Sequence, residues 1–111
     1  SNPELGINAI EIMHLVTSKL ITYRQNMQKH YSDSAFKVAV PTMNFGCIHG
    51  GATPNRLCAS CELHFDTRLL PGMSPAEVTR DIEGILQALA KEQNCNIKTP
   101  KKILVIGHLL Y

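Results

Sequence analysis

Apolar residues near the N-terminus recur at steps of three and four, which is the spacing of an amphipathic helix. We therefore predict a helix over residues 7–30, with Asn2 and Pro3 able to start its first turn. The expected buried stripe consists of Ile7, Ile10, Met13, Val16, Leu20 and Tyr23.

After residue 30 the period changes. The segment FKVAVPTMNFGCI (36–48) has the composition of an extended chain, and Pro41 indicates a break or a sheet edge. The clearest strand lies within LCASCELHFDTRLL (57–70), because apolar and polar residues alternate there. The apolar face would hold Leu57, Ala59, Cys61, Leu63, Phe65 and Leu69; the polar face would hold Cys58, Ser60, Glu62, His64, Asp66 and Arg68.

A second helix is predicted after the turn PGM (71–73). Ser74 fits the N-cap, Pro75 the first helical position and Glu77 the third, which together form a capping box. The expected buried stripe consists of Val78, Ile82, Ile85, Leu86 and Leu89. The C-terminal segment KKILVIGHLLY has the composition of a strand.

The predicted order is therefore helix, two strands able to form a hairpin, helix, strand. One further strand in front would give a βαββαβ ferredoxin-like split unit, an α+β fold with two helices on one face of an antiparallel sheet. We expect residues 1–111 to form one domain of this class whose first strand is absent from the chain.

Composition narrows the function classes. With 111 residues, 44% of them apolar, the chain can bury one modest core. The net charge is +2, the basic residues are scattered and there is no Trp, which disfavours nucleic-acid binding. No apolar run is long enough to span a membrane and no signal-peptide layout is visible, so we expect a cytoplasmic protein with reduced cysteines.

The cysteines and histidines suggest metal or redox chemistry, but their spacing does not favour it. In CASC (58–61), alternation would send the two sulfurs to opposite faces, so we expect Cys61 in the core and Cys58 partly covered. A zinc site of Cys47, His49, Cys58 and His64 matches no known zinc spacing, and we predict no metal site in this chain. The remaining histidines are expected to be surface or hydrogen-bonded residues: His14, His30 and His108.

The loop HGGATPN (49–55) joins the two strands of the hairpin. Gly50 and Gly51 allow positive φ or close approach of the backbone to a ligand, although a plain flexible loop would look the same. Arg68 can bind a carboxylate through two parallel hydrogen bonds, and Asn55 can add a polar contact. The alternative for Arg68 is a surface ion pair with Asp66 or Glu62, and the residues alone leave both interpretations open.

Residues 3 to about 90 together resemble a known family. PELGINAIEIMHLV and IHGGATPNRLCASCELHFDTRLLPGM are similar to the dimerisation (lid) domain of zinc-dependent metallopeptidases of the aminoacylase/carboxypeptidase family. The series CxxCELH…D-x-R-x-LPGM points to the acetylornithine deacetylase branch, with succinyl-diaminopimelate desuccinylase as the nearest rival. This resemblance implies a lid of a larger hydrolase of N-acetyl-ornithine in arginine biosynthesis.

The resemblance also implies partners and site residues. The catalytic domain of the same chain would bind zinc, or cobalt, and a glutamate there would activate a water molecule. The lid would form a homodimer and contact a small N-acetyl amino acid. Asn55 and Arg68 match the family's substrate-contacting Asn and Arg, and Gly50 and Gly51 match the adjacent loop. No catalytic or metal-binding residue is expected within these 111 residues.

Two features depart from the family pattern. The family's lid begins with a strand ending in Gly-His, which precedes the segment resembling SNPELG and is missing here. The tail KTPKKILVIGHLLY (98–111) has no counterpart, and it either forms the fourth strand, fills the place of the first strand, or is foreign. A stand-alone module that pairs through its sheet edge is the alternative to a lid.

Overall fold

The predicted first helix forms as α1 (Ala9–His30) in the computed structural model, which describes residues 6–30, 40–99 and 102–107. Asn8 precedes the helix, and its Oδ1 accepts the N–H of Ile10 at 2.9 Å. The proposed first turn at Asn2 and Pro3 lies outside the described residues. The prediction for Ile10 was wrong: its side chain is 48% exposed, because the buried stripe passes instead through Ala9 and Ile12.

The predicted hairpin consists of β1 (Thr42–Gly50) and β2 (Ser60–Arg68), paired antiparallel from Thr42–Arg68 to Gly50–Cys61. A register shift between Phe45 and Cys47 inserts Gly46 as an extra residue in β1. The first residues of the predicted extended segment, 36–39, lie outside the described residues. β1 has a strand partner only on its β2 side, so its other edge is open.

Alternation along β2 is confirmed from Ser60 onward, where Cys61 and Leu63 are buried and Glu62 and His64 lie on the other face. It was wrong before Ser60. Cys58 is 3% exposed and belongs to the core, while Ala59 is exposed. The regular strand begins only at Ser60, so the two-residue period does not extend back to Cys58.

The second helix, α2 (Pro75–Gln93), starts as the capping-box pattern predicts. Ser74 Oγ accepts the N–H of Glu77 at 3.2 Å. The helix ends at Asn94, whose φ of 54° places it in the left-handed region that commonly terminates helices. The buried side chains of α2 are Val78, Ile82, Leu86, Leu89 and Ala90.

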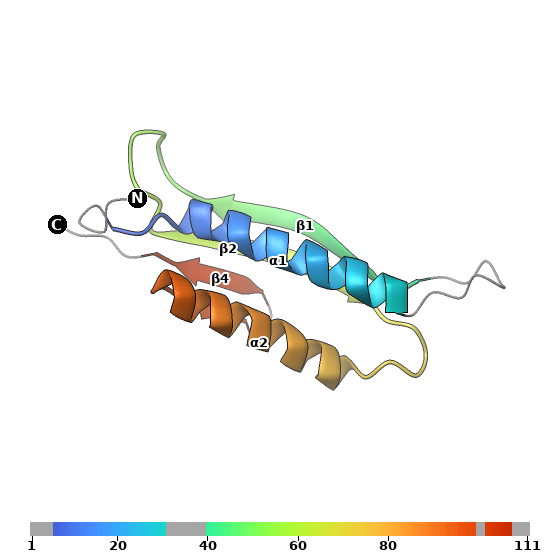
Figure 1. The fold of residues 1–111 in the computed structure, drawn as a ribbon. Coiled ribbons are helices and arrows are strands. Elements are labelled where there is room, and N and C mark those ends of the chain that lie inside the picture. The colour runs from blue at the N-terminus through green and yellow to red at the C-terminus, as the bar shows by residue number, and fades with distance from the viewer. Residues whose placement is uncertain (1–5, 31–39, 100–101, 108–111) are drawn as a thin grey trace.

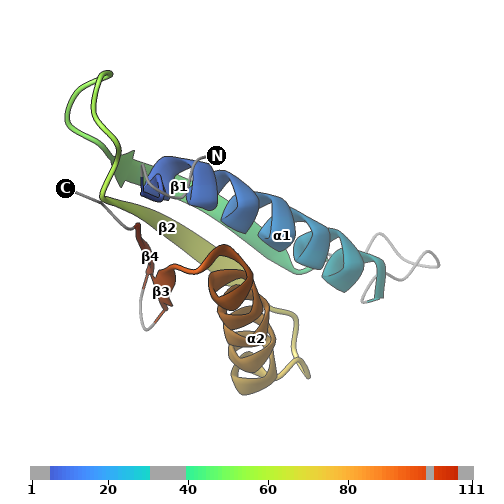
Figure 2. The ribbon, with the colours of Figure 1, turned by 60° about the vertical axis from the view of Figure 1, so that its left-hand side comes forward.

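Two short strands, β3 (Asn96–Lys98) and β4 (Ile103–Ile106), complete a four-stranded antiparallel sheet in the order β1-β2-β4-β3. Both helices lie on one face of this sheet and diverge from each other (Figures 1 and 2). The predicted α+β class with a ferredoxin-like arrangement is confirmed. We call the sheet face that neither helix covers the open face.

The C-terminal strand β4 takes the place of the first strand of a split βαββαβ unit. β4 and β1 flank β2 and are both antiparallel to it, so they are parallel to each other. The residue after β4, Gly107, donates its N–H to Ala59 O at 2.8 Å. A Cβ at Gly107 would collide with the carbonyl oxygen of Ile7, just before α1. β4 therefore ends where α1 begins; His108 lies outside the described residues.

The core lies between the sheet and the two helices. Its most buried side chains come from all three layers: Met13, Leu20, Leu63, Leu86, Ile103 and Val105. β4 pairs with β2 only from Ser60 to Leu63, so the other half of β2 has a strand neighbour on the β1 side alone. Along that half, Phe65, Thr67, Val78 and Ile82 line a pocket of about 150 Å³ between β2 and α2.

Candidate functional site

The two glycines at the end of β1 have different physical roles. A Cβ at Gly50 would lie 2.9 Å from Cys61 Sγ and 3.1 Å from Ser60 O, so close packing against β2 requires glycine at this position. Gly51 has a φ of 87°, which residues with a side chain rarely adopt. Gly50 is thus explained by packing within the hairpin and Gly51 by the turn of the chain.

Asn55 lies in a tight turn at the tip of the β1–β2 loop. The N–H of Arg56 donates to Thr53 O at 3.4 Å, which closes the turn, and Pro54 occupies the position where β-turns favour proline. The hydroxyl of Thr53 donates to Oδ1 of Asn55. Asn55 is exposed, and its carboxamide is held from within its own turn.

Arg68 is the last residue of β2 and lies on the open face. Its Nε is 3.5 Å from Asp66 Oδ2, and the two side chains are 84% and 69% exposed. The predicted ion-pair alternative is therefore present in the structure. It occupies Nε and leaves the two Nη groups, so it does not prevent Arg68 from binding a carboxylate.

The structure does not bring Asn55 and Arg68 together within one chain. The loop that contains Asn55 precedes β2, and Arg68 ends it (Figure 1). The eight residue steps from Ser60 to Arg68, at about 3.3 Å each, separate the two ends of β2 by roughly 26 Å. A molecule the size of an N-acetyl amino acid cannot span that distance, so these two residues of one chain cannot contact the same small ligand.

The cysteine pair of CASC is a buried structural feature. Cys58 Sγ donates to Ser60 O at 3.0 Å. Burial raises the pKa of the Cys61 thiol, and the neighbouring Cys58 and Glu62 raise it further. A thiol with a raised pKa is a poor nucleophile and metal ligand at neutral pH, because both roles need the thiolate.

The four residues of the weighed zinc site do not share one surface. Cys58 is in the core, Cys47 is exposed on β1, and the rings of His49 and His64 meet edge to face with centroids 5.9 Å apart. Among residues 6–30, 40–99 and 102–107, no group of three or more His, Cys, Asp or Glu side chains is placed to hold a metal ion.

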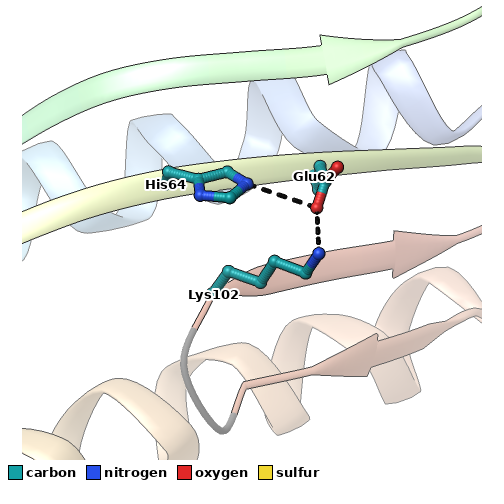
Figure 3. Close-up of polar contacts among 3 residues, drawn as sticks. All are labelled: Glu62, His64 and Lys102. Atoms are coloured by element: carbon teal, nitrogen blue, oxygen red, sulfur yellow. Dashed lines mark hydrogen bonds and ion pairs between the residues drawn. The ribbon is translucent and has the colours of Figure 1, made fainter.

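A polar network on the open face links β2 to the start of β4. Glu62 Oε2 lies 2.5 Å from Lys102 Nζ and 3.3 Å from His64 Nε2 (Figure 3). The hydrogen bond from Lys102 lowers the pKa of the Glu62 carboxyl, and His64 contributes in the same direction. Sequence reasoning missed this network, because the pairing of β4 with β2 that brings Lys102 to Glu62 has no local signal.

No helix among the described residues is both long enough and apolar enough to cross a membrane.

Comparison with known proteins gives the chain a family context. Residues 1–94 match the model of the peptidase dimerisation domain. An acetylornithine deacetylase of Photorhabdus laumondii is 49% identical over 86 residues, which cover 78% of this chain and 21% of that protein. An acetylornithine deacetylase of Vibrio cholerae is 54% identical over 74 residues, covering 67% of this chain and 20% of that protein.

A third relative extends the similarity toward the C-terminus. An acetylornithine deacetylase of Vibrio vulnificus is 42% identical over 106 residues, covering 96% of this chain and 26% of that protein. The chain therefore spans about a fifth to a quarter of the length of the curated relatives it matches.

Proposed function

The chain belongs to the family of peptidase dimerisation domains, and from this premise we propose that residues 1–111 are the lid of a two-domain acetylornithine deacetylase. The observation that carries the proposal is the hairpin IHGGATPNRLCASCELHFDTRLLPGM, within a chain 42–54% identical to acetylornithine deacetylases. The parent enzyme would hydrolyse N-acetyl-ornithine to ornithine and acetate, as a cytoplasmic step of arginine biosynthesis.

The metal of such an enzyme belongs to another part of the protein in this proposal. The described residues do not fit a zinc or cobalt site, because their carboxylate, imidazole and thiol groups do not converge. A catalytic domain of the same polypeptide would hold the metal and the general base, and the lid would contribute substrate contacts and assembly. The 111-residue chain alone would then be inactive.

We propose that two lids pair through the open edge of β1 to form a homodimer. Two large apolar side chains are exposed at this edge: Ile48 is 55% exposed on β1, and Ile10 is 48% exposed at the start of α1. A Cβ at Gly51, one residue after β1, would lie 3.5 Å from Ile10 Cδ1, so Ile10 adjoins the loop end of β1. An open strand edge flanked by exposed apolar side chains is suited to pairing with another strand.

The same symmetry would bring Asn55 and Arg68 of different subunits together. If β1 pairs antiparallel with its copy across a two-fold axis, Thr42 of one chain lies near Gly50 of the other. Thr42 is paired with Arg68, and the loop bearing Asn55 follows Gly50. Each end of the joined sheet would then carry Arg68 of one subunit and Asn55 of its partner, so one substrate could contact both.

The proposed activity is tested with the full-length enzyme and three substrates: N-acetyl-ornithine, N-succinyl-diaminopimelate and N-acetyl-methionine. We expect the highest kcat/KM with N-acetyl-ornithine, and a preference for the succinyl substrate would contradict the assignment. The isolated chain, assayed with added Zn²⁺ or Co²⁺, should show no turnover.

Sedimentation tests the proposed assembly. The full-length enzyme should sediment as a dimer, and Ile48→Glu should shift it toward monomer because a charge would enter the paired edge. Ala88→Glu, on an exposed position of α2, is the matched control. An Ile48→Glu enzyme that remains dimeric at every concentration would remove β1 from the interface.

A further inference from the structure

Asn55 has a hydrogen-bond partner in its own turn whose role neither the family match nor the relatives' names assign. Its Oδ1 accepts the hydroxyl proton of Thr53. A carboxamide has an acceptor end and a donor end, so this contact uses the acceptor and leaves both N–H groups of Nδ2 for another molecule. Both residues are exposed, so a ligand can reach the donor end.

We propose that Thr53 is a positioning residue that makes Asn55 a hydrogen-bond donor toward an oxygen anion of the substrate. The inference rests on the proposed function, in which Asn55 contacts the substrate. The oxygen anion is either the substrate carboxylate or the oxyanion that develops at the amide carbon during hydrolysis. A substrate N–H group would need the opposite end of the carboxamide.

The hydroxyl of Thr53 favours this orientation of Asn55 over the flipped one. In the flipped carboxamide, one Nδ2 proton would be spent on Thr53 Oγ1 and Oδ1 would face the ligand, where it would repel an anion. In the observed orientation, the bond to Oδ1 polarises the amide and strengthens its N–H groups as donors. Rotation about the terminal torsion of Asn is otherwise nearly free, so an orienting contact changes the population of the competent state.

The backbone of the turn makes the contact local and reproducible. The hydrogen bond from the Arg56 N–H to Thr53 O fixes Thr53 and Asn55 at the two ends of a three-residue segment, and Pro54 restricts the backbone between them. Asn55 is therefore oriented by its own loop and does not need a contact from the sheet or the helices.

The test removes only the hydroxyl. Thr53→Val in the full-length enzyme keeps the β-branched shape and should lower kcat/KM for N-acetyl-ornithine roughly two- to tenfold, the usual effect of one hydrogen bond. Thr53→Ser restores the hydroxyl and should retain kcat/KM to within about twofold. Thr79→Val, at an exposed position of α2, is the control for a generic threonine-to-valine change.

A double-mutant cycle separates orientation from general disturbance of the loop. If Thr53 acts through Asn55, Thr53→Val should cause no further loss in an Asn55→Ala enzyme, and both single variants should change the same parameter, KM or kcat. Equal losses from Thr53→Val in both backgrounds would overturn the inference, as would a loss that Thr53→Ser does not rescue.

The failure of this inference differs from failure of the proposed function. A wild-type Thr53→Val enzyme together with a strongly impaired Asn55→Ala enzyme would refute the role of Thr53 and leave the lid assignment intact. A wild-type Asn55→Ala enzyme would remove Asn55 from the substrate site, and the role of Thr53 would fall with it.

Discussion

The two ends of the β1–β2 hairpin present their polar side chains in different ways. At the loop end, Asn55 is held by Thr53 in a closed turn, and β2 is paired with strands on both sides. At the other end, Arg68 is largely exposed, its one ion-pair partner is Asp66, and β2 is paired with β1 alone. The loop end presents an oriented carboxamide, whereas the strand end presents a long, adaptable cation.

This difference shows why one chain is an incomplete site. The strand that separates Asn55 from Arg68 is straight and well paired, so bending cannot bring its ends to one ligand. Symmetry can, because an antiparallel two-fold axis places the loop end of one hairpin beside the strand end of its copy. In this account, dimerisation assembles the substrate contacts as well as joining two subunits.

The strand end should give the largest effect on activity. Arg68→Ala in the full-length enzyme removes a charged contact to a bound carboxylate and should cost about 2–5 kcal/mol in kcat/KM, mainly through KM. Steady-state kinetics with N-acetyl-ornithine measures it, and Arg80→Ala on α2 is the matched control. Wild-type kcat/KM in Arg68→Ala would reduce the residue to a surface ion pair with Asp66.

The loop end should give the largest effect on stability. Gly50→Ala places a methyl group against Cys61 Sγ and Ser60 O and should destabilise the domain by about 1–3 kcal/mol, as overpacking does. Urea unfolding of the domain measures the change. Gly84→Ala is the control: it lies within α2, no neighbouring atom lies within 4 Å of the added Cβ, and it should stabilise by about 0.5–1 kcal/mol. Equal stability of the Gly50→Ala protein would mean that the glycine is not needed for packing.

The smallest effect concerns the flank of β2 that β4 covers. Lys102 lowers the pKa of Glu62, whose ordinary value is 4.5, so the folded state holds this proton less tightly than the unfolded state. The stabilisation is therefore present above pH 4.5 and is lost as the pH falls through the lower, folded-state pKa.

Lys102→Met should make the thermal midpoint less dependent on pH below that value, and Lys98→Met on β3 is the control. A full acid dependence in Lys102→Met, followed by circular dichroism, would exclude the Lys102–Glu62 pair as its source. The measurement also shows whether β4 stays in place when this contact is removed.

The sequence predicts those parts of the fold whose signals are local. The helical period of α1, the capping box of α2 and the alternation after Ser60 depend on neighbouring residues, and the structure confirms them. β3 has three residues, too few for a periodic signal, and the sequence analysis missed it.

Features that depend on tertiary contacts were not predictable in the same way. Ile10 and Cys58 were assigned to the wrong environment, because the helix rotation and the strand start are set by packing. The place of β4 between β2 and β3 is a choice among three that the pattern left open. Asn55 and Arg68 were chosen by resemblance, and only the length of β2 shows that they lie at opposite ends.

Subunit complementation tests the central claim most directly. Full-length Arg68→Ala and Asn55→Ala enzymes, each impaired as a homodimer, are unfolded and refolded together in equal amounts. If each site combines Arg68 of one subunit with Asn55 of its partner, half of the dimers are mixed and each has one intact site, so activity should return to about a quarter of wild type. No recovery in a mixture proven to contain mixed dimers would contradict the shared site.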